Sequence, residues 1–163
     1  MTSTNRQTME TDEREFKEMV MRHRDMIWSI CKRYRLSSAW QTEDSFNEVL
    51  CALWQSCGTF DRRSSERTWV FRIANNTMIS ISRRINNQES PHNTHQDTAY
   101  SDEYKFHVAD MIEQLEEPDQ TIVRSWLYGF KHSETAQIVG LHTGAVSMRL
   151  SRALHKLRKL YKQ

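Results

Sequence analysis

The sequence predicts an all-α protein made of two small helical domains. Only four glycines and two prolines occur among the 163 residues, too few turn formers for a sandwich or barrel of many short strands. Apolar residues recur at helical spacing along most of the chain, and no segment alternates with a period of two. A polar stretch at residues 86–101, with almost nothing apolar to bury, divides the helical parts. We therefore expect a disordered N-terminus at residues 1–13, a first helical domain at 14–85, a flexible linker at 86–105 and a second helical domain at 106–163.

The composition excludes several classes of protein. Apolar residues make up 37% and charged residues 27% of the chain, and the longest apolar run, Val49–Trp54, is far shorter than the ~18 residues needed to span a bilayer. Residues 1–13 lack the apolar segment of a signal peptide. The three cysteines form no C-x-x-C pair, so we expect them to be buried as small apolar side chains in a cytoplasmic protein.

Charge is spread unevenly, although the net charge is only +2. Residues 21–35 carry five basic groups against one acid, and residues 61–84 carry six arginines against two acids. Residues 102–121 carry seven acids against one lysine, whereas residues 133–163 are basic again. Two basic regions separated by an acidic one suit two surfaces that meet a polyanion.

The first half of the chain contains three predicted helices. Apolar residues between positions 16 and 34 fall on one face of a helix of about 20 residues. A second helix follows over residues 42–57, with Thr42 as its N-cap and two acids in its first turn. The third should begin near Ser64 or Ser65 and run to about Arg84.

The second half begins with two further predicted helices, around residues 108–115 and 122–127. Pro118 and Asp119 mark the start of the second of these helices, and Gly129 marks its end.

Residues 132–158 have the spacing of a helix-turn-helix. A short helix at about Ser133–Val139 ends at Gly140, and a second helix begins with Thr143 as its N-cap. The second helix places Val146 and Leu150 on its buried side and a polar, basic surface on its other side, which fits the major groove of DNA. The alternative is a plain antiparallel helix pair with a solvated basic face.

Three segments resemble the extracytoplasmic-function (ECF) class of bacterial sigma factors. Gly144–Ala153 (GAVSMRLSRA), with Ser133–Ala136 (SETA) before it, resembles the segment of that class that binds the promoter −35 element. Glu43–Trp54 (EDSFNEVLCALW) is similar to the helix that grips the polymerase clamp. Phe60-Asp61, followed by Thr68–Asn76 (TWVFRIANN) and Arg83-Arg84, resembles the segment that opens and reads the −10 element. The motifs occur in the family's order, over roughly residues 14–84 and 106–160.

The resemblance implies a transcription initiation factor that binds core RNA polymerase and directs it to promoters. It implies core RNA polymerase, promoter DNA and an anti-sigma factor as partners. We expect a monomer when free, with no insertion into membranes. We also expect no catalytic residues and no cofactor. We expect no metal site either, since His92 and His95 lack cysteine partners and helical scaffolding.

The resemblance assigns site residues by position. Those for docking onto core polymerase are Asp44, Asn47, Glu48, Leu50 and Trp54. Those for the −10 element are Phe60, Asp61, Trp69, Arg72, Asn75, Asn76, Arg83 and Arg84. Those for the −35 element are Thr143, Gly144, Ser147, Met148, Arg149, Ser151, Arg152 and Lys156. The acidic edge of the docking helix has a second interpretation as a solvated face, and Trp69 has one as a core residue packed with Ile73.

Several positions depart from the family pattern, and they bear on the expected promoter sequence more than on the expected function. Asn47 stands where glutamine is usual, while Asn75, Ser80 and Ser147 each lack a charge that the family usually has; Thr135 stands where isoleucine is common. The alternatives are a polymerase-independent helix-turn-helix regulator, an adaptor that binds polymerase without DNA, and a small hydrolase or nuclease. The regulator would need a dimer seam, and the hydrolase would need a clustered site that the scattered histidines do not form.

Overall fold

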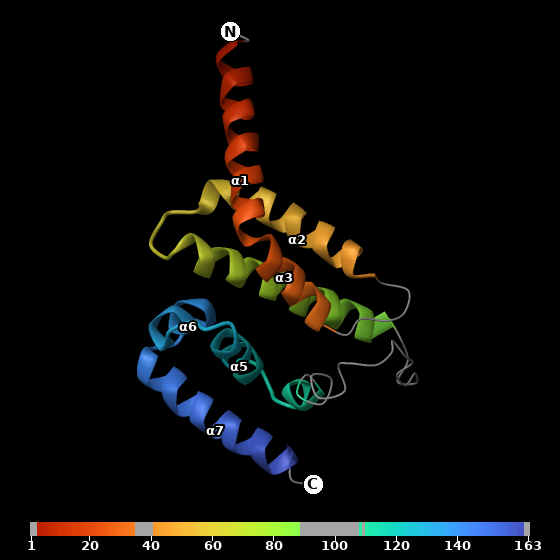
Figure 1. The fold of residues 1–163 in the computed structure, drawn as a ribbon, viewed down its shortest axis with the longest axis vertical. Coiled ribbons are helices and arrows are strands. Elements are labelled where there is room, and N and C mark those ends of the chain that lie inside the picture. The colour runs from red at the N-terminus through yellow and green to blue at the C-terminus, as the bar shows by residue number, and fades with distance from the viewer. Residues whose placement is uncertain (1–2, 35–40, 89–107, 109, 162–163) are drawn as a thin grey trace. The chain divides into compact units, whose positions relative to one another are not determined.

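The computed structural model describes residues 3–34, 41–88, 108 and 110–161, and the chain divides into two units, Met1–Ser90 and Pro91–Gln163. Regular structure in these described ranges is helical throughout (Figure 1), which confirms the predicted all-α class. None of the described helices combines the length and hydrophobicity that crossing a membrane would require.

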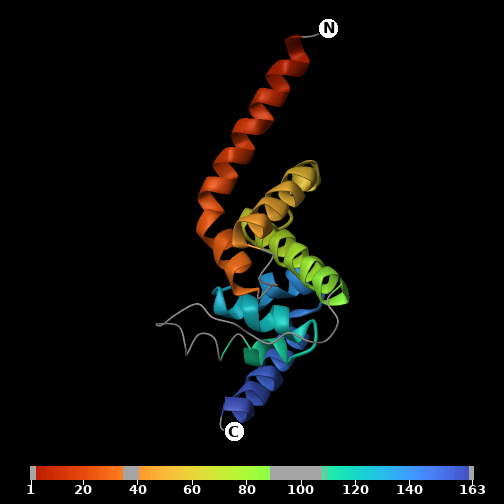
Figure 2. The ribbon, with the colours of Figure 1, turned by 90° about the vertical axis from the view of Figure 1, so that its right-hand side faces the viewer.

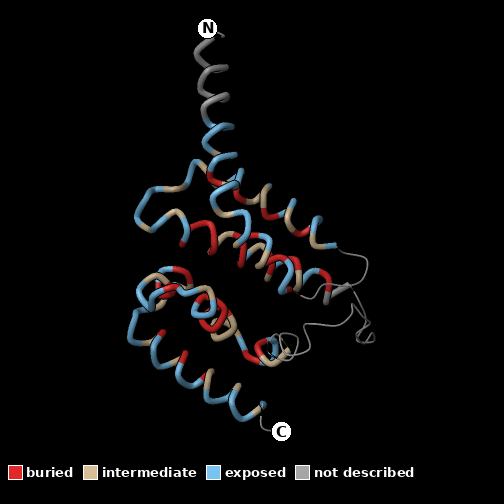
Figure 3. The backbone as a smooth tube through the Cα atoms, viewed as in Figure 1, coloured by how far each residue is buried: buried red, intermediate tan, exposed pale blue. Residues whose placement is uncertain are grey.

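The first unit is built from three helices that pack against one another in pairs. They are α1 (Ser3–Arg33), α2 (Thr42–Ser56) and α3 (Glu66–Gln88), with a single 3-10 turn, η1 (Cys57–Thr59), after α2. Residues that are inaccessible to solvent come from all three helices: Ile27 from α1, Val49 and Leu53 from α2, and Val70, Phe71, Ala74 and Met78 from α3. The buried positions of α3 are coloured red in Figure 3.

α1 is longer than the sequence predicted. Residues 1–13 were expected to be disordered, but α1 begins at Ser3, and its N-terminal part projects beyond the other helices of the unit in both ribbon views (Figures 1 and 2). No glycine or proline precedes Gly58 in the sequence, so nothing local stops the helix. Extending an existing helix adds one hydrogen bond for each residue that is fixed, which costs much less than nucleating a new helix.

The N-terminus of α2 is capped one residue earlier than expected. Gln41, rather than Thr42, is the N-cap, and its backbone N–H donates a hydrogen bond to Asp44 Oδ2 at 3.1 Å. Asp44 therefore satisfies one free donor at the helix start, as the acidic residue of a capping box does.

α3 begins as predicted and ends later. Ser65 precedes the helix, and its Oγ accepts a hydrogen bond from the Thr68 N–H at 3.1 Å, as an N-cap side chain does. The helix continues to Gln88, so residues 86–88, which were assigned to the linker, are helical. The rest of the predicted linker, residues 89–105 with His92 and His95, lies outside the described residues.

The second unit packs α5 (Asp119–Leu127), α6 (His132–Val139) and α7 (Thr143–Tyr161) around one core, after a short helical segment at residues 110–113. Gly129 and Gly140 have φ angles of 75° and 70°, which fits the helix ends predicted at these glycines. The core residues are Ile112, Leu115, Ile122, Val123, Ala136, Val146, Leu150 and Ala153.

His142, rather than Thr143, precedes α7 and caps it. The Ala145 backbone N–H donates a hydrogen bond to His142 Nδ1 at 3.2 Å, whereas Thr143 is already the first residue of the helix. A threonine one residue too late cannot occupy the N-cap position, and the imidazole supplies the acceptor in its place.

The three cysteines differ in environment. Cys31 is buried, and burial raises the pKa of its thiol to about 12. Cys57 is half-buried, but Cys51 is exposed on α2. The expectation of buried cysteines was therefore wrong for Cys51, which lies next to the apolar face of its helix rather than on it.

Candidate nucleic-acid and protein interfaces

One side of α7 is free of core contacts. Val146, Leu150 and Ala153 face the core, and the residues between them are exposed, except for the partly buried Arg149. Seven of the eight residues predicted for this surface are exposed: Thr143, Gly144, Ser147, Met148, Ser151, Arg152 and Lys156. Together they form a small, polar and basic surface of the kind that can enter a major groove.

Arg149 is the exception among the predicted DNA-binding residues of α7. Its Nε donates a hydrogen bond to Asp119 Oδ1 at 2.7 Å, and both side chains are partly buried. Asp119 is in the first turn of α5, where a carboxylate also interacts favourably with the helix dipole. Arg149 therefore links α7 to the start of α5 rather than pointing away from the unit. Asp119 lies 30 residues from Arg149 in the sequence, so no local motif indicates this contact.

The first helix of the predicted helix-turn-helix is tied to α5 by a pair of hydroxyls. Thr135 is buried on α6, and its Oγ1 lies 3.0 Å from Ser125 Oγ on α5. The Ser125 hydroxyl also donates to the Ile122 carbonyl at 2.9 Å. The threonine that replaces the family's usual isoleucine is thus paired inside the core.

Two residues predicted to contact the −10 element are buried in the first unit. Trp69 is 3% exposed, and its ring packs against Phe60 with the centroids 5.1 Å apart. Asn75 is 1% exposed, and its Oδ1 accepts a hydrogen bond from the Tyr34 hydroxyl at 2.9 Å. Neither side chain is therefore available to DNA in this fold, and for Trp69 this favours the second interpretation, as a core residue.

The other residues predicted for the −10 element remain at the surface. Asn76, Arg83 and Arg84 are exposed on α3, and Asp61 is exposed in the loop before it; Phe60 and Arg72 are partly exposed. Asp61 accepts a hydrogen bond from the Arg63 backbone N–H at 3.1 Å and pairs with the Arg63 guanidinium. The backbone bond from Arg63, with its side chain, lowers the pKa of Asp61. The carboxylate therefore organises the loop, in which Arg62 adopts a φ of 60°.

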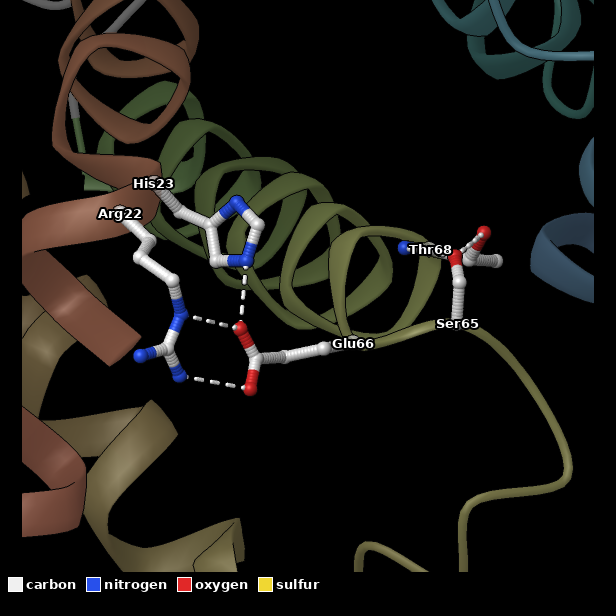
Figure 4. Close-up of polar contacts among 5 residues, drawn as sticks. All are labelled: Arg22, His23, Ser65, Glu66 and Thr68. Carbon is white, nitrogen blue, oxygen red and sulfur yellow. Dashed lines mark hydrogen bonds and ion pairs between the residues drawn. The ribbon is translucent and has the colours of Figure 1, made fainter. Parts of the chain in front are cut away.

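A cluster that sequence reasoning missed joins α1 to the start of α3. Figure 4 shows Glu66, at the beginning of α3, directed toward Arg22 and His23 of α1. Arg22 Nε and Nη2 donate to the two carboxylate oxygens at 3.1 and 2.9 Å, and His23 Nε2 lies 2.8 Å from Oε1. Hydrogen bonding from Arg22 lowers the pKa of Glu66, with a smaller contribution from His23, while burial acts in the opposite direction. The partners are 43 and 44 residues apart, so no local motif indicates them.

The predicted docking edge on α2 is exposed and lies beside apolar surface. Asp44, Asn47 and Glu48 are exposed, Leu50 is partly buried, and Trp54 packs edge-on against Phe16 with the ring centroids 5.0 Å apart.

α1 adds two exposed apolar side chains that the sequence did not single out. Met21 is 72% exposed, and Trp28, at the limit of exposure, packs edge-on against Phe46 of α2 at 5.5 Å. Aromatic side chains and methionine are enriched at protein interfaces, where a few aromatic side chains carry most of the binding energy.

Family models match both units. Residues 19–88 match sigma-70 region 2, and residues 107–157 match sigma-70 region 4. Together the two matched ranges cover well over half of the chain, and each falls almost wholly inside one unit.

Known proteins are similar over most of the chain. The ECF RNA polymerase sigma factor RpoE of Cereibacter sphaeroides is 28% identical over 134 residues, which cover 76% of this chain and 74% of that protein. The structure of CnrH in complex with the cytosolic domain of CnrY is similar with a TM-score of 0.69 and 23% identity, over 92% of this chain and 89% of that one. RpoE in complex with the anti-sigma factor NepR, from Bartonella quintana, is similar with the same TM-score and 20% identity, over 91% of this chain and 97% of that one.

Replacing Glu66 should alter the stability of the first unit in a pH-dependent way. Because the pKa of Glu66 is lowered in the folded state, its ionised form stabilises the fold above the unfolded-state pKa of ~4.3, and this contribution is lost as the pH falls through the folded-state value. The difference in free energy of unfolding between the parent and Glu66→Gln should therefore be constant near neutral pH and shrink below about pH 4. Urea unfolding followed by tryptophan fluorescence measures it.

The matched control for Glu66→Gln is Glu48→Gln, which removes an exposed carboxylate of α2 outside the cluster. A difference between parent and Glu66→Gln that persists unchanged to pH 3 would contradict the role of the Glu66 charge.

Proposed function

The chain belongs to the sigma-70 family of RNA polymerase sigma factors, in its ECF class, and we propose how its two units divide the work of that class. The protein is a transcription initiation factor that binds core RNA polymerase and directs it to promoters through their −10 and −35 elements. The polymerase supplies the chemistry, and this chain supplies no catalytic residue in our proposal. We also propose that it acts in the cytoplasm, as a monomer when free.

The exposed side of α7 is the single observation that carries the −35 assignment. It presents Ser147, Met148, Ser151 and Arg152 opposite the buried residues of the same helix. In a helix-turn-helix, the N-terminal residues of the second helix reach base edges, while basic residues further along hold phosphates. In our proposal Arg152 contacts a base, and Lys156 contacts a phosphate.

The first unit in our proposal reads and opens the −10 element. Arg72, Asn76, Arg83 and Arg84 remain accessible on α3 after the core is formed, and Phe60 is partly exposed in the loop that precedes it. Aromatic rings and cationic side chains suit single-stranded DNA, because bases stack on rings while cations hold the backbone. Phe60 rests on buried Trp69, which would keep its ring in place.

The exposed edge of α2 is our proposed docking surface for core polymerase, with Asn47 and Glu48 as polar contacts and Trp54 as an apolar one. We further propose regulation by an anti-sigma factor, since a similar fold was solved with such a partner. The apolar surface around Met21, Trp28 and Trp54 supports a protein partner for the first unit.

Run-off transcription with core RNA polymerase on a library of genomic promoter fragments tests the proposal. We expect start sites that require this protein and that share two sequence elements upstream. Capture of core polymerase without transcripts would instead favour an adaptor, provided that the core is a matched one. Absence of both transcripts and capture would favour a polymerase-independent regulator.

Replacing Asn47 and Glu48 together with alanine should weaken binding to core polymerase by more than about 1 kcal/mol, as truncation of interface anchors does. Titration of labelled core polymerase with the full chain measures the affinity. Asp44 is left intact, because its carboxylate accepts the Gln41 N–H and its loss would also destabilise α2. Glu43→Ala, on the same exposed helix, is the control and should stay within about 0.5 kcal/mol. Equal affinities for parent and double variant would refute the docking assignment.

A double-mutant cycle should distinguish a positioning role of Arg149 from a DNA contact. If Arg149 holds α7 through Asp119, then Arg149→Ala and Asp119→Ala each weaken promoter binding by the holoenzyme, and the double variant is no weaker than the worse single one. We expect a coupling energy of about 0.5–1 kcal/mol, since the pair is partly exposed. Lys156→Ala is the control. The binding free energy that this variant loses should add to the binding free energy lost by Asp119→Ala. Normal or tighter binding by Asp119→Ala would identify Arg149 as a direct DNA contact.

A further inference from the structure

Met148 is an apolar side chain on the polar side of α7. It is 57% exposed, and the described part of the helix has only one other large exposed apolar side chain, Tyr161, at its far end. The buried residues Val146, Leu150 and Ala153 define the core side of the helix. At about 100° per residue, Met148 points almost directly away from that side. It therefore lies at the centre of the surface proposed to enter the major groove.

The neighbours of Met148 leave its side chain accessible. One turn before it is Gly144, and a Cβ at Gly144 would come within 3.3 Å of the ring of His142, which caps the helix. The glycine thus avoids a tight contact with the capping ring and places no side chain one turn before Met148. Ser147 and Ser151 are small and exposed, and Arg152 follows one turn later.

Each base pair presents a distinct set of groups in the major groove. Guanine, cytosine and adenine present hydrogen-bond donors or acceptors, whereas thymine also presents an apolar C5-methyl group. A thioether side chain makes no strong hydrogen bond, so it gains little from the polar edges and gains most by covering a methyl group.

We propose that Met148 recognises a thymine methyl group in the −35 element, which rests on the proposed placement of α7 in the major groove. Arg152 has the geometry to donate two hydrogen bonds to a guanine. One helical turn separates the two residues, or about 6 Å along the axis. The thymine should therefore lie within about two base pairs of the base that Arg152 contacts, since base pairs are ~3.4 Å apart.

Replacement of thymine by deoxyuridine tests this inference, because it removes the methyl group and leaves the Watson–Crick pairing intact. The holoenzyme is bound to a promoter duplex from the run-off experiment, and each thymine of either strand of the −35 element is replaced singly. We expect one position, or two adjacent ones, at which the parent binds about fourfold more weakly, the value of one buried methyl-sized group. Met148→Gln should bind the thymine and deoxyuridine duplexes equally, whereas Met148→Leu should retain discrimination.

Leu127→Gln is the matched control, since it makes a similar apolar-to-amide change at an exposed side chain of the same unit outside α7. It should discriminate as the parent does. The inference is overturned if the parent binds the promoter but discriminates at no thymine, or if Met148→Gln discriminates as strongly as the parent. Failure of the holoenzyme to bind any promoter would overturn the proposed function as well, and is distinct from both of these results.

Discussion

Burial of one face of α3 limits what the first unit can present to its partners. α3 packs against both α1 and α2, and it contributes Trp69, Val70, Phe71 and Asn75 to their common core. A side chain of α3 that is buried in this way cannot also contact DNA from the exposed side of the helix. The −10 motif is thus divided by folding, with its tryptophan and first asparagine inside and its arginines and second asparagine outside. Function on α3 is confined to what the core leaves exposed.

The same constraint has a different outcome in the second unit. α7 lies on the edge of its three-helix core and buries a single stripe, so the opposite side is open along the whole helix. Arg149 is on the flank between the two sides, where it reaches Asp119 of α5. Because α7 is held by one row of buried residues and one ion pair beside it, its exposed residues can be substituted without altering the core of the unit. This separation explains how Ser147, which is exposed, can depart from the family pattern in a chain that keeps the fold.

The sequence was sufficient for the helices, for the two units and for the exposed surface of α7, because these depend on the spacing of apolar residues and on glycine at helix ends. It was insufficient wherever a side chain meets a distant partner. Asn75 and Asn76 are adjacent and chemically identical, but Asn75 is buried and accepts a hydrogen bond from the Tyr34 hydroxyl, 41 residues away, whereas Asn76 is exposed. The pairs Arg22–Glu66 and Asp119–Arg149 have separations of 44 and 30 residues, so no local pattern in the sequence indicated either contact. The caps at Gln41 and His142 were missed for another reason. The threonines beside them, Thr42 and Thr143, are better N-caps by propensity, and the predicted helix start differs from the observed one by a single residue.

Each of the two units has a core of its own. Within each unit the helices pack against one another, and the exposed side of α7 lies opposite the residues that α7 contributes to the core of the second unit. Both surfaces belong to one chain, so their contacts with the −10 and −35 elements combine when the chain is bound to one polymerase. Neither contact therefore needs to be tight by itself. Specificity can then change one element at a time. In our proposal, Met148 changes the preference for a base at the −35 element by about the free energy of one methyl contact, which is enough to select among promoters. Because the side chain is exposed, a substitution there leaves the core of the second unit as it is.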